Sequence, residues 1–230
     1  MSFGLSQSGA NHELSTRLAD IRQRIPPSVR LIGVTKTFSS DIVQQAYDAG
    51  LREFAENKVQ EALPKQAELG SLTDVIWHFI GHIQSNKALK VVENFDWIHS
   101  VDSLKLAARL DRQAKILGKR PSCCLQVKLV PDPAKTGFEV DTLMSALADL
   151  DRLSAIDIRG LMVIPPYGLK ASEVREIFER GTTLAQEIAR RSPVNMTMDQ
   201  LSMGMSGDFE QAIAAGATMV RIGSGLFGPR

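Results

Sequence analysis

Residues 31–40 read LIGVTKTFSS, and this stretch decides between the two folds that the rest of the chain allows. Its apolar run, residues 31–34, predicts a buried β-strand. A doubly wound open sheet would bind a nucleotide through a glycine-rich turn after its first strand. Here the strand is followed by Lys36, Thr37 and Phe38 instead. We therefore favour the other fold, a (β/α)8 barrel.

Short apolar segments and amphipathic segments alternate along the chain, as they do in a barrel of parallel strands joined by helices. We expect strands at residues 31–35, 52–55, 75–80, 97–101, 124–130, 158–164, 197–202 and 218–223. We expect helices at residues 12–24, 40–49, 57–68, 84–93, 103–117, 140–153, 171–191 and 208–215. This order predicts one α/β domain, a (β/α)8 TIM barrel over residues 11–230. Residues 1–10, which are rich in Ser and Gly, are predicted to form a flexible N-terminal tail.

The composition excludes several classes of partner. Lys and Arg number 27 against 26 for Asp and Glu, and a formal charge of +1 gives no support for binding to nucleic acid or to a membrane surface. No apolar run approaches the ~20 residues of a membrane span, and the N-terminus lacks a secretory signal. Cys123 and Cys124 are adjacent in a predicted strand and point to opposite faces, so we expect free thiols and a cytoplasmic protein.

Lys36 closes the first predicted strand, where an ammonium group in an apolar site is costly. Burial lowers the pKa of a lysine, and a neutral amine is a nucleophile that forms a Schiff base with an aldehyde. The alternative is a lysine at a strand edge whose stem is buried and whose amine reaches water. These few residues leave both interpretations open.

Two loops of small polar residues follow the last two predicted strands. Residues 202–208 read SMGMSGD and residues 223–228 read GSGLFG, and barrels often bind phosphate with the loops at these positions. The alternatives are a cap on the helix over 208–215 by Ser206 and Asp208, and a simple glycine-rich turn at the C-terminus. Closure of a barrel pairs the last strand with the first, which places Lys36 on the same rim as both loops.

An aldehyde that carries a phosphate would satisfy the lysine and the loops together, and pyridoxal 5'-phosphate (PLP) is the leading candidate. Arg221 lies two residues before Gly223, so the two residues face the same side of their strand. An arginine beside the pyridine nitrogen cannot accept a proton and would leave the ring a weak electron sink. The alternative is a structural salt bridge of Arg221 with Glu56 or Asp199 inside the barrel.

Further polar side chains follow the second and third predicted strands. Asn57 and the run Gln84–Ser85–Asn86 are expected to line the same rim. His78 and His82 are four residues apart, but the segment between them is predicted to be strand and turn, so we expect no metal site.

Seven motifs resemble those of the YggS/PROSC family of pyridoxal phosphate homeostasis proteins: GVTKTF, FAENKVQE, WHFIGHIQSNK, IHSVDSLKLA, IRGLMVI, LSMGMSGDFEQAI and VRIGSGLFG. The resemblance implies fold type III, the barrel of the N-terminal domain of alanine racemase. It implies that Lys36 is the Schiff-base lysine, that Arg221 faces the pyridine nitrogen and that Asn57 lies near the ring. The residues that it assigns to the phosphate are Ser202, Ser206, Gly223 and Ser224; family members often have Thr in place of Ser224, which keeps the hydroxyl.

The resemblance also implies a monomer that regulates the cellular level of PLP and the amino-acid balance without an established catalytic activity. We expect PLP-accepting apo-enzymes as transient partners. A PLP-dependent racemase with weak activity is the alternative, and it would need a second acid or base. Tyr167 is expected on the same rim, whereas Tyr47 is expected to be buried or on the outer ring of helices. A Schiff-base aldolase acting on a phosphosugar is a third hypothesis, which the family motifs disfavour.

Overall fold

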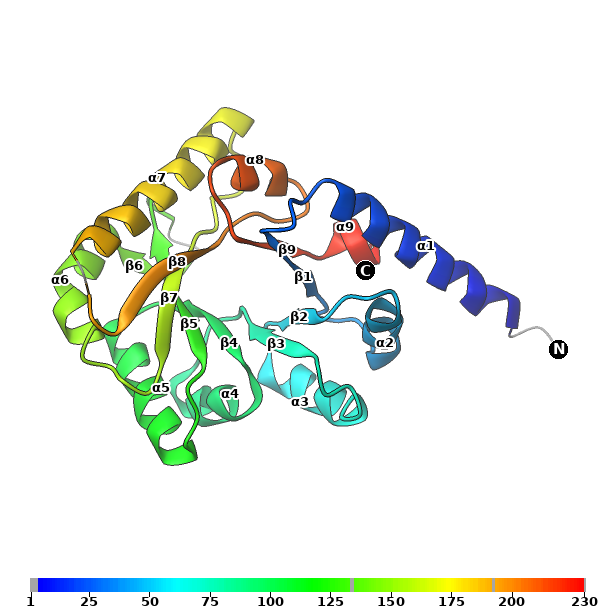
Figure 1. Cartoon of the computed structure of the whole chain (residues 1–230), viewed down its shortest axis with the longest axis horizontal. Helices are drawn as coiled ribbons and strands as arrows, with labels where there is room; N and C mark the ends of the chain where they lie inside the picture. The colour runs from blue at the N-terminus through cyan, green and yellow to red at the C-terminus, as the bar shows by residue number, and fades with distance from the viewer. Residues whose placement is uncertain (1–3, 133–134, 192, 230) are drawn as a thin grey trace.

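The computed structural model describes residues 4–132, 135–191 and 193–229. Its strands form one parallel sheet in the order β4-β3-β2-β1-β9-β8-β7-β5, and a pairing of β4 with β5 closes the sheet into an eight-stranded barrel (Figure 1). The barrel strands are β1 (Arg30–Val34), β2 (Glu53–Glu56), β3 (Ile76–Phe79), β4 (Trp97–Val101), β5 (Ser122–Lys128), β7 (Asp157–Met162), β8 (Met196–Ser202) and β9 (Met219–Ile222). The TIM barrel predicted from the sequence is confirmed.

Helices surround the strands on the outside (Figure 1). They are α1 (Gly4–Gln23), α2 (Ser40–Asp48), α3 (Val59–Glu68), α4 (Ala88–Asn94), α5 (Leu104–Leu117), α6 (Val140–Leu150), α7 (Ala171–Arg190), α8 (Phe209–Ala214) and α9 (Ser224–Phe227). The apolar stripe of α7 shows why they dock: its buried residues recur at helical spacing and include Ile177, Leu184 and Ile188.

Several boundaries differ from the expected ones. β5 begins at Ser122 and ends at Lys128, two residues earlier than expected, and a short strand β6 (Phe138–Glu139) adds to its edge. The helix expected at 84–93 is split into a 3₁₀ turn, Ser85–Lys87, and α4.

The N-terminal helix begins at Gly4, eight residues before the helix that we expected. Leu14, Leu18 and Ile21 anchor its buried side, and a nucleated helix extends at little further cost. The predicted tail therefore overlaps α1 over residues 4–10, and residues 1–3 lie outside the described residues. The predicted mobility of residues 1–10 stays a prediction.

Apolar residues form two clusters on the two sides of the barrel wall. The larger cluster fills the layer between strands and helices. The smaller cluster lies inside the barrel and consists of Ile32, Val34, Ala55, Trp97, Cys124, Met162 and Met219. Cys123 belongs to the outer cluster, so the two free cysteines face opposite sides as predicted. Burial raises the pKa of the Cys124 thiol to about 12, which keeps this thiol protonated and unreactive.

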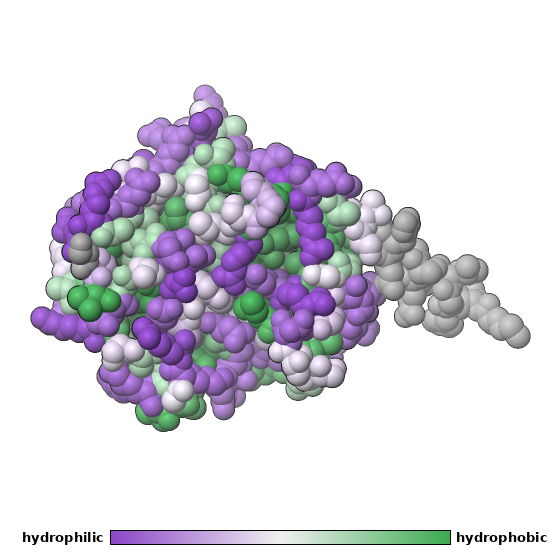
Figure 2. Space-filling model, viewed as in Figure 1, coloured by the Kyte–Doolittle hydropathy of each residue, from purple (hydrophilic) through white to green (hydrophobic). Residues whose placement is uncertain are grey.

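The face of the molecule in Figure 2 is mostly hydrophilic, with hydrophobic residues scattered among the polar ones. Within the described ranges, no helix combines the length and the apolar character needed to cross a bilayer.

Candidate functional site

A cavity of about 350 Å³ opens at the rim where the barrel strands end. Its lining combines residues at or after the ends of β1, β2, β3, β7, β8 and β9: Val34, Lys36, Asn57, Ile80, Gly81, Met162, Ile164, Met205, Ser206, Gly207, Arg221, Gly223 and Ser224. Six of the seven predicted site residues therefore meet in one cavity. A volume of this size, with apolar walls and a few polar groups, is typical of a small-molecule site.

Lys36 lies in a tight turn directly after β1 and is half-buried at the cavity wall. The Phe38 N–H donates to the carbonyl of Thr35 at 3.0 Å, which closes the turn around Lys36 and Thr37. Thr37 has a φ of 70°, a left-handed conformation that is strained for a β-branched residue. The turn places Lys36 among the residues that line the cavity.

A buried ion pair lies behind this turn. The Lys65 ammonium is 2.5 Å from Glu56 Oε1 and donates to the Thr35 carbonyl at 2.9 Å. The Thr35 hydroxyl also donates to Glu56 Oε1, at 2.7 Å. Because Glu56 is fully buried and Lys65 is 6% exposed, these bonds are shielded from water. The ion pair thus ties α3, β2 and the end of β1 together and fixes the backbone that precedes Lys36.

Asn57 lines the cavity and carries a buried, unpaired acceptor. Its Oδ1 is buried and has no hydrogen-bond partner among the described residues. The backbone of Asn57 is packed against Gly81, where a Cβ would lie only 2.0 Å from the Asn57 carbonyl oxygen. A buried acceptor without a donor is unfavourable, and a ligand that donates a hydrogen bond here would relieve the cost.

The loops after β8 and β9 contact each other at the cavity edge. The Gly225 N–H donates to Ser206 Oγ at 3.1 Å, so Ser206 keeps its own hydroxyl proton for another acceptor. Asp208 accepts from the Met205 N–H at 2.6 Å and makes no side-chain cap on α8. The alternative interpretation of Ser206 and Asp208 as a helix cap is therefore wrong. Instead, Ser206 joins the α9 segment.

Arg221 is 3% exposed and forms part of the cavity floor. It donates to the hydroxyl of Ser202 and to the Val163 carbonyl, the latter at 3.4 Å. Burial lowers the pKa of this guanidinium to about 10. The alternation of side chains along a strand explains its place, since Ile32 of the neighbouring strand, which pairs with Arg221, also faces the barrel interior.

The predicted alternative, a salt bridge of Arg221 with Glu56 or Asp199, is wrong. Glu56 pairs with Lys65, and Asp199 pairs with Arg159 at 2.5 Å. Side chains alternate between the two faces of a strand. Glu56 follows the inward-facing Ala55, and Asp199 lies three residues before the inward-facing Ser202, so both acidic side chains point out of the barrel.

Ser202 is the predicted site residue that does not reach the cavity. It is fully buried, lies outside the cavity lining, and contacts Arg221 and His99 instead. The reason is its position inside β8, before the loop that bends toward the rim. Sequence reasoning assigned no interior role to His78 or His99. His78 alternates with Ile76 and Ile80, and His99 alternates with Trp97, and this alternation with inward-facing residues could have revealed two polar groups inside the barrel.

Other polar residues expected at the rim lie outside the lining of this cavity. Gln84, Ser85 and Asn86 are exposed in the 3₁₀ turn and lie outside the cavity lining. Tyr167 is fully exposed at 103% and also lies outside it. Tyr47 lies in α2 on the outer ring, where its hydroxyl donates to Asp74 at 2.5 Å, as expected.

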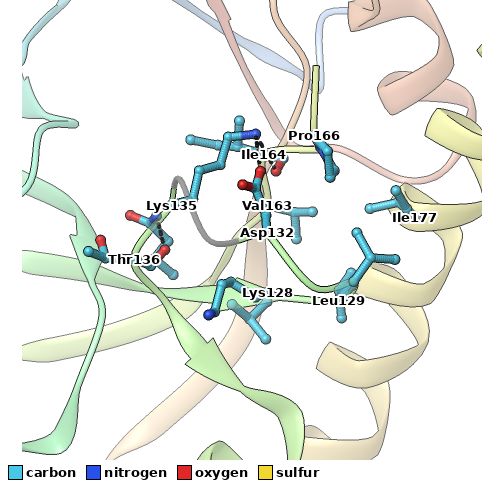
Figure 3. Close-up of a pocket in the computed structure, with 12 residues that line it drawn as sticks. Lys128, Leu129, Asp132, Lys135, Thr136, Val163, Ile164, Pro166 and Ile177 are labelled. Atoms are coloured by element: carbon cyan, nitrogen blue, oxygen red, sulfur yellow. Dashed lines mark hydrogen bonds and ion pairs between the residues drawn. The ribbon is translucent and has the colours of Figure 1, made fainter. Parts of the chain in front are cut away.

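Lys135 lies beside a separate, smaller pocket near the end of β7 (Figure 3). It donates to the carbonyls of Ile164 and Pro165 at 3.3 and 2.6 Å and pairs with Asp132 at 3.2 Å. Ile164 lines the cavity on its other side, so this contact supports the cavity wall.

Residues 11–230 match the family model described as the N-terminal domain of alanine racemase. A pyridoxal phosphate homeostasis protein of Synechocystis is 50% identical over 212 residues, which are 92% of this chain and 96% of that protein. The chain belongs to the YggS/PROSC family. The Escherichia coli K12 pyridoxal phosphate homeostasis protein is 39% identical over 235 residues, covering 95% of this chain and 97% of that protein.

Solved structures agree with this family assignment. PipY of Synechococcus elongatus PCC7942 with PLP bound superposes with a TM-score of 0.90 at 50% identity, over 94% of this chain and all of that chain (100%). Alanine racemase of Clostridium difficile 630 gives a TM-score of 0.73 at 17% identity, over 95% of this chain and 57% of that chain. The second likeness shows a shared barrel fold and nothing more.

Proposed function

We propose that this YggS/PROSC protein binds PLP in the rim cavity and contributes to PLP homeostasis as a holder of the cofactor. The observation that carries the proposal is the meeting of Lys36, Arg221, Ser206 and Ser224 around one cavity of about 350 Å³. Bound PLP supplies an aldehyde that forms a Schiff base with a primary amine, together with a phosphate and an electron-withdrawing ring. The presence of PLP in the structure of PipY, at 50% identity, supports the proposal.

The cavity residues fit this cofactor group by group. Lys36 is the amine that would form the Schiff base. Ser206 and Ser224 would donate their hydroxyl protons to the phosphate, and Gly223, where the nearest atom to a Cβ would be 3.6 Å away, leaves its backbone open to the phosphate. Asn57 offers its unpaired Oδ1 at the side of the ring.

Arg221 would hold the pyridine nitrogen. A guanidinium can only donate, so it binds an unprotonated nitrogen and leaves the ring a weak electron sink. A weak electron sink suits racemase-like chemistry or simple holding of the cofactor, and it disfavours transamination, which uses an acidic partner at this nitrogen. In this arrangement Ser202 contacts Arg221 and not the phosphate.

A racemase fits the cavity less well. Racemisation needs a second acid or base on the ring face opposite the lysine. Among the described residues that line the cavity, Lys36 and Arg221 are the ionisable ones, and Tyr167 projects into solvent. We therefore propose no catalytic role.

An open cavity also suits transfer of the cofactor. We propose that the protein acts as a cytoplasmic monomer and passes PLP to apo-enzymes that form transient contacts at the rim. Release to an apo-enzyme that is faster than spontaneous dissociation of PLP would support this; equal rates would contradict direct transfer.

The binding proposal is tested by comparing PLP with pyridoxal, which lacks the phosphate. We expect the dialysed protein to bind PLP at least ~100-fold more tightly, since two or more hydrogen bonds to a charged group are lost with pyridoxal. The double variant S206A/S224A should lose most of that preference. Ser145→Ala, an exposed serine on α6, is the matched control. Equal affinity for the two ligands, or an unchanged preference in S206A/S224A, would contradict the proposal.

A further inference from the structure

A line of four buried side chains and one half-buried side chain runs through the barrel interior below the cavity. Arg221 donates to Ser202 Oγ, which lies 2.7 Å from His99 Nδ1. His99 Nε2 lies 2.9 Å from His78 Nδ1. At the far end, His78 Nε2 is 3.1 Å from Glu53 Oε2, a distance of close electrostatic contact without the full geometry of a hydrogen bond. We call these five residues the interior chain.

The far end of the interior chain lies near the opposite mouth of the barrel. Glu53 is the first residue of β2 and lines a second cavity of about 380 Å³, together with Leu31 and Arg52. Asn57, four residues later, lines the rim cavity. At ~3.3 Å per strand residue, Glu53 and Asn57 are roughly 13 Å apart along β2. The interior chain therefore spans the barrel between its two mouths.

The two ends of the interior chain determine where its protons lie. A guanidinium only donates and a carboxylate only accepts. Since Ser202 Oγ accepts from Arg221, its own hydroxyl proton is free to go to His99 Nδ1. His99 then carries its proton on Nε2 and donates it to His78 Nδ1. His78 in turn carries its proton on Nε2 and directs it to Glu53. Every proton points from Arg221 toward Glu53.

The charges agree with this direction. Burial lowers the pKa of His78 and, further, that of His99, which keeps both imidazoles neutral. Burial pushes the pKa of the Glu53 carboxyl upward, but hydrogen bonds from His78 and Arg30 outweigh it and leave that pKa below its usual range. The carboxylate is shared with Arg30, whose guanidinium is 2.8 Å away and 4.7 Å from the centroid of the Trp97 ring.

We infer that His99 is a positioning residue for Arg221, and that the interior chain holds the Arg221 guanidinium with its remaining N–H groups directed at the ligand in the rim cavity. The inference rests on the proposed binding of PLP. Arg221 has no carboxylate partner among the described residues, so its orientation depends on Ser202 and on the Val163 carbonyl. Ser202 can keep accepting from Arg221 because His99 accepts the hydroxyl proton of Ser202.

The inference has a second consequence for Ser202. Its one hydroxyl proton goes to His99, so it has none to donate to a phosphate. Substitution of Ser202 and substitution of His99 should therefore act through the same bond. A phosphate ligand and an independent buried histidine would instead have separate effects that add.

The test measures the histidine rings and the bound cofactor separately. In the apo protein, ¹⁵N NMR should find His78 and His99 neutral, with the proton on Nε2 in both. An Nδ1–H tautomer or an imidazolium at His99 would overturn the inference. This readout needs no PLP, so it stands even if PLP does not bind and the proposed function fails.

The second readout is the visible absorption spectrum and the dissociation constant of bound PLP. H99F removes both hydrogen bonds while filling the space of the ring, and we expect a shifted band and about tenfold weaker binding or more. H99N, whose Oδ1 can still accept from Ser202, should stay within about threefold of the wild type. Ile98→Val is the control, because Ile98 is buried next to His99 but faces the outer cluster.

A combination of variants separates positioning from general damage to the core. S202A should reproduce the shift of H99F, and S202A/H99F should be no weaker than either single variant. An unchanged spectrum and affinity in H99F, or effects of S202A and H99F that add, would overturn the inference. Should H99F fail to fold, H99N, S202A and the NMR of the wild type still decide the question.

Discussion

The most direct structural prediction concerns the buried ion pair behind Lys36. Lys65→Met keeps most of the volume of the lysine stem but removes the ammonium, which leaves the Glu56 carboxylate buried with the Thr35 hydroxyl as its donor. The variant also takes away the hydrogen bond that holds the Thr35 carbonyl. The damage should therefore reach both the stability of the barrel and the turn that positions Lys36.

The size of the effect follows from the contacts. Two hydrogen bonds of a charged donor are lost, each worth about 1.5–3 kcal/mol, and removal of one partner of a buried ion pair costs about 3–5 kcal/mol. We use the range of about 3–5 kcal/mol, since the cost of losing one partner of the ion pair already counts the lost hydrogen bonds. For a domain of this size each kcal/mol lowers Tm by about 2–4 °C, so we expect a drop of roughly 6–20 °C.

Urea unfolding, followed by the fluorescence of the two tryptophans, measures the loss of unfolding free energy. Adding Glu56→Gln to Lys65→Met removes the stranded charge and leaves an acceptor for Thr35, so it should recover about 2 kcal/mol. Lys58→Met is the control, because Lys58 pairs with Glu61 at the exposed surface. A cost below ~1 kcal/mol for Lys65→Met, or no recovery in the double variant, would refute the reasoning.

Three further predictions concern backbone strain and acid stability. Thr37→Gly should raise the free energy of unfolding by about 1 kcal/mol in urea, because glycine adopts the φ of 70° without strain; a loss of stability would contradict this. Gly204→Ala should cost about 2 kcal/mol or more in the same assay, since φ is +91° and a Cβ would lie 2.7 Å from Ala212 Cβ; a neutral change would contradict it. Because burial lowers the pKa of His78 and His99, the unfolded chain binds protons below about pH 6.5 that the folded chain does not. Thermal unfolding should therefore show that stability decreases as the pH is lowered below about 6.5, by up to about 1.4 kcal/mol per pH unit for each histidine. H99F should reduce that slope.

The barrel could be predicted because its evidence is periodic. Apolar runs mark the strands, and the segment after β1 excludes a nucleotide-binding glycine turn. The same period placed Arg221 and Gly223 on one side of β9, and both line the cavity. Six of the seven predicted site residues line one cavity, because strand ends in a parallel barrel converge on one rim.

The remaining features depend on contacts that a linear pattern does not contain. The interior position of Ser202 depends on where β8 ends, and the bond between Ser206 and Gly225 depends on how two loops fold back. The sequence allows Glu56 as a partner of Arg221, but Glu56 alternates with the inward-facing Ala55 and so points out of the barrel. The interior chain joins residues of β2, β3, β4, β8 and β9, which come together only when the barrel closes.

The central claim is that Lys36 holds PLP covalently in the rim cavity. Borohydride reduction of the protein after addition of PLP, followed by peptide mass mapping, tests it most directly, because reduction converts a Schiff base into a stable pyridoxyl adduct. We predict one adduct on the peptide that contains Lys36, its loss in Lys36→Ala, and no change in Lys58→Ala, a control on an exposed neighbouring lysine. A dominant adduct on any other lysine, or none after PLP is added, would contradict the account.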